Sequence, residues 1–157
     1  MTNIGPHITA FLRQRLPVER AASPNTCDTY AYAFRLLFEF ASRKLGVTPS
    51  ALHLEQLDAA LVLEFLAHLQ TARGNGPRTR NARLTAIKSF MHFVEHRVPG
   101  ALEQITRILA IPIQKADQRL VDHLTAEQCT RLLEAPDPTT RTGIRDRTML
   151  HLGVAGG

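Results

Sequence analysis

An apolar repeat between residues 24 and 45 constrains the fold more than any other feature of this sequence. Its members are spaced as i, i+4 and i+7, which places them on one face of an α-helix. They are Tyr30, Phe34, Leu37, Phe38, Ala41 and Leu45. Ser23 can cap this helix, Pro24 suits its first position, and Gly46 suits its end. The segment therefore predicts one long helix with a single buried face.

The same periodicity predicts three further helices in the first 98 residues, and no segment has a convincing strand pattern. We expect them near residues 8–16, 58–71 and 79–98. Pro17 ends the first of these helices or closely follows its end, and Asp58 caps the next helix and places a negative charge at its start. The chain is therefore predicted to fold as an all-α bundle.

The second part of the chain has a different pattern. Residues 101–109 suit a short helix, whereas residues 111–123 are polar and interrupted by a proline, which is typical of an interdomain linker. Thr125 and Gln128 then form a capping-box pattern at the start of another helix. A last helix begins near residue 142 and runs to the end of the chain.

Composition excludes several classes of protein. Hydrophobic residues make up 44% of the chain and charged residues 21%, which is typical of a globular protein. No apolar run approaches the ~20 residues that a bilayer requires, and no signal peptide is visible, so we expect a cytoplasmic protein. Cys27 and Cys129 form neither a disulfide framework nor a zinc pattern. Serine-hydrolase and nucleotide-binding motifs are absent, and we predict no cofactor and no small-molecule substrate.

The predicted helix near residues 79–98 carries a basic stripe beside its apolar face. At about 100° per residue, this stripe comprises Arg78, Asn81, Thr85, Lys88, His92 and His96. Such donors suit the phosphates and base edges of DNA, and an α-helix fits the major groove. Arg80 and Arg83 point elsewhere and can reach flanking phosphates. An ordinary solvated face is the alternative, but Glu95 is the only acid near the stripe, which favours DNA.

Two residue pairs have side chains that could serve a chemical site. His92 and His96 are four residues apart, as two ligands of one metal can be, but no third ligand cluster accompanies them. We therefore predict no metal site. Tyr30 and Tyr32 are the only tyrosines, and Tyr30 lies on the apolar face, so we interpret it as a core residue and not as a nucleophile.

Four sequence segments occur in an order and spacing that are typical of one protein family. They are Asn25-Thr26 with Tyr30, Phe34, Leu37 and Phe38, then residues 79–90, then Leu124-Thr125-Ala126-Glu127-Gln128 with Leu132-Leu133, and finally residues 143–157. In their order and spacing they resemble the tyrosine recombinases, the family of phage integrases and Xer-like proteins. The resemblance implies a four-to-five-helix core-binding domain over residues 1–110 that clamps DNA. It also implies a linker over residues 111–123 and two helices of an incomplete catalytic domain over residues 124–157.

The family resemblance implies DNA strand exchange through a covalent phosphotyrosyl link, without a metal or nucleotide cofactor. In the family, the first catalytic arginine follows a segment like Ala155-Gly156-Gly157, where this sequence stops. Arg145 and Arg147 precede that position, so neither is assigned as the catalytic arginine. We therefore expect no catalytic residue and no enzymatic activity from this chain alone.

In the family, the second and fourth helices of the core-binding domain face the DNA. Carried over by position, and joined with the basic stripe and the linker, this implies a set of DNA-contacting candidates. They are Thr26, Arg35, Arg78, Thr79, Arg80, Asn81, Arg83, Thr85, Lys88, His92, Lys115 and Arg119. The expected partners are duplex DNA and other recombinase protomers, with no membrane.

Two alternatives remain open from the sequence. The first is a helical protein–protein module that associates with a full-length recombinase, since Met149, Leu150, Leu152 and Val154 would lack most of their partners in a short second unit. The second is a helix-turn-helix regulator, but the loop at residues 74–77 only loosely satisfies the short turn that such a motif needs.

Overall fold

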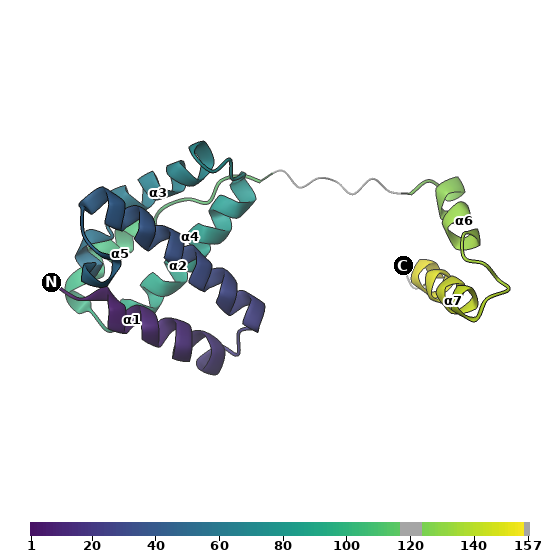
Figure 1. Cartoon of the computed structure of the whole chain (residues 1–157), viewed down its shortest axis with the longest axis horizontal. Helices are drawn as coiled ribbons and strands as arrows, with labels where there is room; N and C mark the ends of the chain where they lie inside the picture. Colours follow the sequence, from purple (N-terminus) through teal and green to yellow (C-terminus); the bar gives the residue numbers. More distant parts are fainter. Residues whose placement is uncertain (117–123, 156–157) are drawn as a thin grey trace. The chain divides into compact units, whose positions relative to one another are not determined.

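The computed structural model describes residues 1–116 and 124–155, which belong to two compact units divided after Ala116 (Figure 1). The regular elements of the described residues are helices, and the one β-bridge among them joins Asn3 to His53. The predicted all-α fold is confirmed. In the part of the chain that the structure describes, no helix is long and apolar enough to cross a membrane.

The first helix is longer than the sequence indicates. α1 (Ile4–Ala10) is capped by the Asn3 side chain, which accepts a hydrogen bond of 2.7 Å from the Gly5 backbone N–H. It continues as the π-helical segment η1 (Phe11–Glu19), in which hydrogen bonds span five residues. The prediction that Pro17 ends the helix is wrong, because the wider π register carries the chain past the proline. The Arg20 N–H donates to the Arg15 carbonyl oxygen at 3.0 Å.

The long second helix has the predicted bounds. In α2 (Pro24–Leu45), Ser23 Oγ accepts from the Thr26 N–H at 3.2 Å, and Pro24 occupies the first turn. Gly46 follows with a φ of +67°, a left-handed conformation that glycine adopts without steric cost. The caps are therefore confirmed. The apolar repeat is buried at its centre, whereas Leu45 at its end is 38% exposed.

Three more helices complete the first unit. They are α3 (Ala59–Thr71), α4 (Pro77–Val94) and α5 (Leu102–Leu109), with short 3₁₀ turns η2 (Pro49–Ala51), η3 (Leu54–Gln56) and η4 (Pro99–Ala101). Asp58 Oδ1 accepts from the Leu61 N–H at 2.7 Å, so the predicted cap of α3 is confirmed. Gln104 of α5 donates its side-chain amide to the carbonyl oxygens of Leu54 and Leu57, at 2.8 and 2.9 Å. This amide fixes the connection that precedes α3.

The core of the first unit is organised around the fully buried Phe11. Its ring centroid lies 6.0 Å from that of Phe34 on α2 and 5.5 Å from that of Phe90 on α4, and both pairs are edge-to-face. Phe93 of α4 lies 5.4 Å from the same ring. A single side chain of η1 therefore joins the first helix to both α2 and α4.

The second unit contains two helices that pack on each other, α6 (Ala126–Glu134) and α7 (Arg141–Ala155). The predicted capping box at the start of α6 is confirmed. Thr125 Oγ1 accepts from the Gln128 N–H at 3.2 Å, and Gln128 Oε1 accepts from the Thr125 N–H at 2.9 Å.

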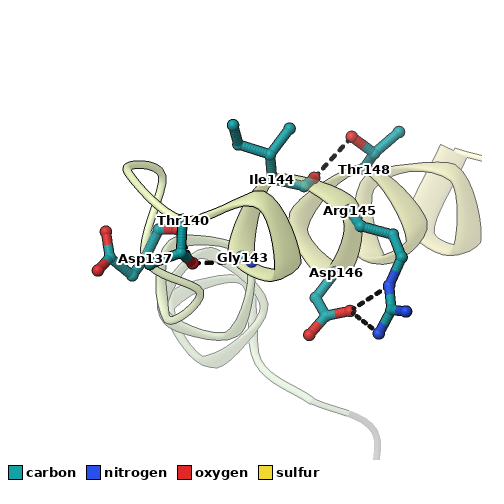
Figure 2. A network of polar contacts seen from close by, with 7 residues as sticks. All are labelled: Asp137, Thr140, Gly143, Ile144, Arg145, Asp146 and Thr148. Atoms are coloured by element: carbon teal, nitrogen blue, oxygen red, sulfur yellow. Dashed lines mark hydrogen bonds and ion pairs between the residues drawn. The ribbon is translucent and has the colours of Figure 1, made fainter.

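The turn between α6 and α7 is closed by a small polar network, which Figure 2 shows. Thr140 Oγ1 accepts from the Gly143 N–H at 3.0 Å and lies 3.3 Å from the Asp137 carbonyl oxygen. The hydroxyl and backbone N–H of Thr139 donate to Asp137 Oδ1, which lowers the pKa of that carboxyl below its ordinary value. Gly143 is buried against this turn, so the backbone of α7 approaches it closely.

We predict that Gly143→Ala disrupts the second unit. A methyl group at this position would overlap the Asp137 carbonyl oxygen and lie 2.8 Å from Thr140 Oγ1. Gly153→Ala is the matched control on the same helix, because its added methyl meets no atom within 4 Å. Hydrogen exchange of α6 and α7, followed by mass spectrometry, should accelerate in Gly143→Ala and not in Gly153→Ala. Equal protection in both variants would contradict the close approach.

Candidate nucleic-acid interface

The predicted basic stripe on α4 is only partly available to a ligand. Arg78, Thr85 and His92 are exposed, and Thr79 and Lys88 are half-buried. Thr85, Lys88 and His92 lie along one side of a hollow that η1, α2 and α4 enclose. These five side chains therefore offer donors to solvent along much of the length of α4.

Two members of the predicted set serve the fold. Arg80 is only 6% exposed, so the expectation that it reaches a flanking phosphate does not agree with the structure. Asn81 Nδ2 donates to the Gln114 carbonyl oxygen at 2.6 Å, and its Oδ1 accepts from the Gln114 N–H at 2.9 Å. One donor and one acceptor of this amide are thus occupied by a single peptide, which holds the side chain against the Gln114 backbone.

Gln114 is also held from a second direction. Its side-chain amide exchanges two hydrogen bonds with the amide of Gln70 on α3, at 2.9 and 3.1 Å. The start of the segment that we interpret as a linker is therefore attached to α3 and α4. Lys115 follows as an exposed side chain, and Arg119 lies outside the described residues.

Three arginines contact the side chain of Tyr32 on α2. The guanidinium carbons of Arg35 and Arg83 each lie 4.9 Å from the ring centroid, and Arg73 Nη2 donates to the tyrosine hydroxyl at 3.4 Å. Arg83 Nη1 also donates to the Thr29 carbonyl oxygen at 3.3 Å. The structure thus brings together two predicted residues, Arg35 on α2 and Arg83 on α4. We call Tyr32 and these three arginines the arginine cluster.

Tyr32 and Arg73 were not among the residues predicted to contact DNA. Arg73 belongs to the connection between α3 and α4 and follows no helical periodicity, so its place beside α2 depends on tertiary packing. Tyr32 follows Tyr30 by two residues, which turns it away from the apolar face. An aromatic residue on the polar side of a helix, near Arg35, was the available signal for a cation–π site.

The remaining candidates have local partners. Thr26 is half-buried in the first turn of α2, with its hydroxyl 2.9 Å from Ser23 Oγ. Glu95 lies between two histidines, 3.1 Å from His92 Nδ1 and 3.2 Å from His96 Nε2. Among the described residues, no three potential ligands are placed to hold a metal ion.

Comparison with known proteins gives consistent results. Residues 8–98 match the family model for the phage integrase N-terminal SAM-like domain. Two proteins of Sinorhizobium fredii that are named as integrase/recombinase, y4rC and y4rD, are 41% and 43% identical over 155 and 147 residues. These matches cover 99% and 94% of this chain but 47% and 52% of the two relatives.

The tyrosine recombinase XerC of Pelotomaculum thermopropionicum is 34% identical over 154 residues, which cover 96% of this chain and 48% of that protein. The chain therefore spans about half the length of these curated relatives. No solved structure matches it.

We predict that Asn81→Ala releases the segment around Gln114. The substitution removes both hydrogen bonds to the Gln114 peptide, and leaving such groups unpaired costs about 1–3 kcal/mol. Trypsin should then cleave after Lys115 faster than in the unmodified chain, as measured by mass spectrometry of timed digests. Asn25→Ala, at an exposed position, is the control. Unchanged cleavage after Lys115 would contradict the assigned role of Asn81.

Proposed function

Since the chain belongs to the phage integrase family of tyrosine recombinases, we propose that it binds duplex DNA with the face that α2 and α4 share. The arginine cluster is the observation that supports this proposal most. It joins cations from α2, α4 and the connection before α4 around one tyrosine. Phosphate groups on neighbouring nucleotides form a matching row of anions.

The electrostatics of the arginine cluster favour an anionic ligand. Three guanidinium groups near one ring repel one another, and the ring face offsets only part of this repulsion. Arg35 has a distant carboxylate at 3.9 Å, from Glu39, and both side chains of that pair are more than half exposed. Such a weak exposed pair leaves the positive charge largely uncompensated. A DNA phosphate would stabilise the arrangement because a guanidinium can donate two hydrogen bonds to it.

The geometry of α4 suits the same ligand. The helix has 18 residues, which at 1.5 Å per residue is about 27 Å of axis. Arg78 lies in its first turn and His92 in its last, with Thr85 exposed between them. An α-helix fits into the major groove of DNA. There, Thr85 can reach a base edge and Arg78 can reach a phosphate.

We expect binding to duplex DNA to weaken steeply as salt rises, because each neutralised phosphate contributes about −0.9 to the slope of log K against log salt. Arg35→Ala and Arg78→Ala should each lower the affinity several-fold and make the slope shallower by about 0.9. Fluorescence anisotropy with a labelled duplex measures both quantities.

Arg107→Ala is the matched control, since Arg107 is an exposed arginine on α5 that pairs with Glu103. It changes the net charge by the same amount away from the proposed face. Absence of duplex binding at low salt would refute the proposed function. Equal losses in all three variants would assign the affinity to net charge alone.

We further propose that the described residues bind DNA without cutting it. The family reaction needs a tyrosine nucleophile, and the rings of both tyrosines of this chain are held by packing within the first unit. Tyr30 is half-buried and stacks on Phe11 at 6.3 Å, and Tyr32 lies under two guanidinium groups. After incubation with plasmid DNA, denaturing electrophoresis should show neither nicked product nor a covalent protein–DNA band. A covalent band lost in Tyr32→Phe would contradict this proposal.

A second candidate function is supported by the second unit. Five large apolar side chains of α6 and α7 are more than two-fifths exposed: Leu132, Ile144, Met149, Leu152 and Val154. Exposed apolar surface of this kind marks interaction sites, and its proposed partner is a full-length recombinase of the same family.

Light scattering of this chain mixed with such a recombinase should show a larger particle. Met149→Lys with Leu152→Lys should abolish it, and two unchanged separate species would count against this function.

A further inference from the structure

We infer that the hollow between η1, α2 and α4 is a seat for one phosphate of the DNA backbone. This inference rests on the proposed function and adds to it a site that includes residues of the first helix. The hollow has a volume of about 440 Å³. Its polar lining consists of Arg15, Arg20, Tyr30, Lys88, Ser89 and His92, with Thr85 at the same wall. We call it the phosphate seat.

The charged side chains that line the phosphate seat are all basic. No carboxylate is among its lining residues, which come from the described part of the first unit. Two acids lie outside it: Glu19 pairs with Arg15, and Glu95 contacts His92. Arg20 and Lys88 have no carboxylate within ion-pair distance among the described residues, so their charges are available to an anion.

Arg20 is held in place for this role. Its Nη1 donates to Ser89 Oγ on α4 at 3.0 Å, which fixes the guanidinium across the opening between the two elements. A guanidinium has five N–H donors, so this hydrogen bond leaves most of them free. Lys88 of α4 is half-buried and lines the same hollow.

The π register of η1 accounts for the position of the two arginines. The Arg20 backbone N–H donates to the Arg15 carbonyl oxygen in a π-type hydrogen bond, and both residues line the hollow. Ala21 then turns the chain with a φ of +46°, an uncommon conformation for a residue with a side chain. Backbone strain of this kind is found at ligand-binding sites, because the surrounding structure must maintain it.

The walls of the phosphate seat suit a nucleotide unit more than an isolated ion. Tyr30 and Phe93 supply aromatic surface next to the cations, and apolar atoms make up part of the lining. Deoxyribose has an apolar face that can rest on such a surface while its phosphate meets the donors. The hydroxyl groups of Tyr30 and Ser89 are neutral donors of the kind that contact DNA phosphates.

The test is a salt titration of duplex binding by Arg20→Ala, Lys88→Ala and the double variant. Each single variant should make the slope of log K against log salt shallower by about 0.9 if its cation meets a phosphate directly. Because the two cations share one phosphate, the double variant should lose less than the sum of the two single losses. Arg13→Ala, an exposed arginine of η1 outside the hollow, should keep the slope of the unmodified chain.

The outcomes separate this inference from the proposed function. If the chain binds duplex DNA and Arg78→Ala weakens binding, but Arg20→Ala and Lys88→Ala do not, the phosphate seat is refuted while the DNA-binding face stands. If the unmodified chain binds no duplex at low salt, both are refuted. Additive losses in the double variant would assign the two cations to different phosphates and overturn the single seat.

A second measurement identifies the source of the phosphate. Inorganic phosphate is titrated against chloride at equal ionic strength, while NMR follows the side-chain signals of Arg20 and Lys88. A backbone seat predicts large shifts with a short duplex and the same small shifts with either salt. Saturation by millimolar inorganic phosphate would reassign the hollow to a free anion and overturn the assignment to DNA.

Discussion

The first unit depends on the position of one side chain, Phe11. Its ring is fully buried and contacts the aromatic rings of α2 and α4, so three helices share a single packing centre. Edge-to-face contacts fix the rotation of each helix as well as its distance, because the rings interlock in one orientation. This rotation decides which side chains of α2 and α4 face solvent. The basic side chains of α2 and α4 are therefore positioned by aromatic packing that lies beside them on the same helices, and Tyr30 and Phe93 belong both to this packing and to the hollow.

Some polar side chains of α4 are used within the fold, whereas others are exposed to solvent. Arg80 and Asn81 are consecutive on α4, and the structure uses both for packing or attachment. Arg78 and Thr85 lie on the same helix and are exposed. A basic or amide side chain on a helix that is proposed to face DNA is thus not by itself a contact residue. Its burial and its existing hydrogen bonds decide whether it can bind DNA.

Local signals in the sequence were sufficient for most of the helices. The caps at Ser23, Asp58 and Thr125 and the stop at Gly46 each depend on a few neighbouring residues, and all four are confirmed. The passage of η1 beyond Pro17 was not predictable in this way, because it depends on a π register that tertiary packing stabilises. The backbone position of Arg20, which follows η1, depends on the same register.

The candidate site was predictable in part, for a related reason. Helical periodicity placed Thr85, Lys88 and His92 on one arc, and the structure lines one hollow with them. Periodicity within one helix does not show which residues of other segments pack against that helix. It therefore could not indicate that Arg73 contacts Tyr32 or that Gln114 contacts Asn81. These contacts join residues 41 and 33 positions apart, and tertiary packing alone determines them.

The attachment of Gln114 has a mechanical consequence for any protein built on this domain. The chain leaves the first unit from a point bonded to both α3 and α4, and the bonds to Asn81 connect this point directly to the helix of the proposed DNA face. A small rotation of α4 on docking would therefore displace the departing chain by a comparable amount. The described end of the first unit is thus coupled to α4 through the side chain of Asn81.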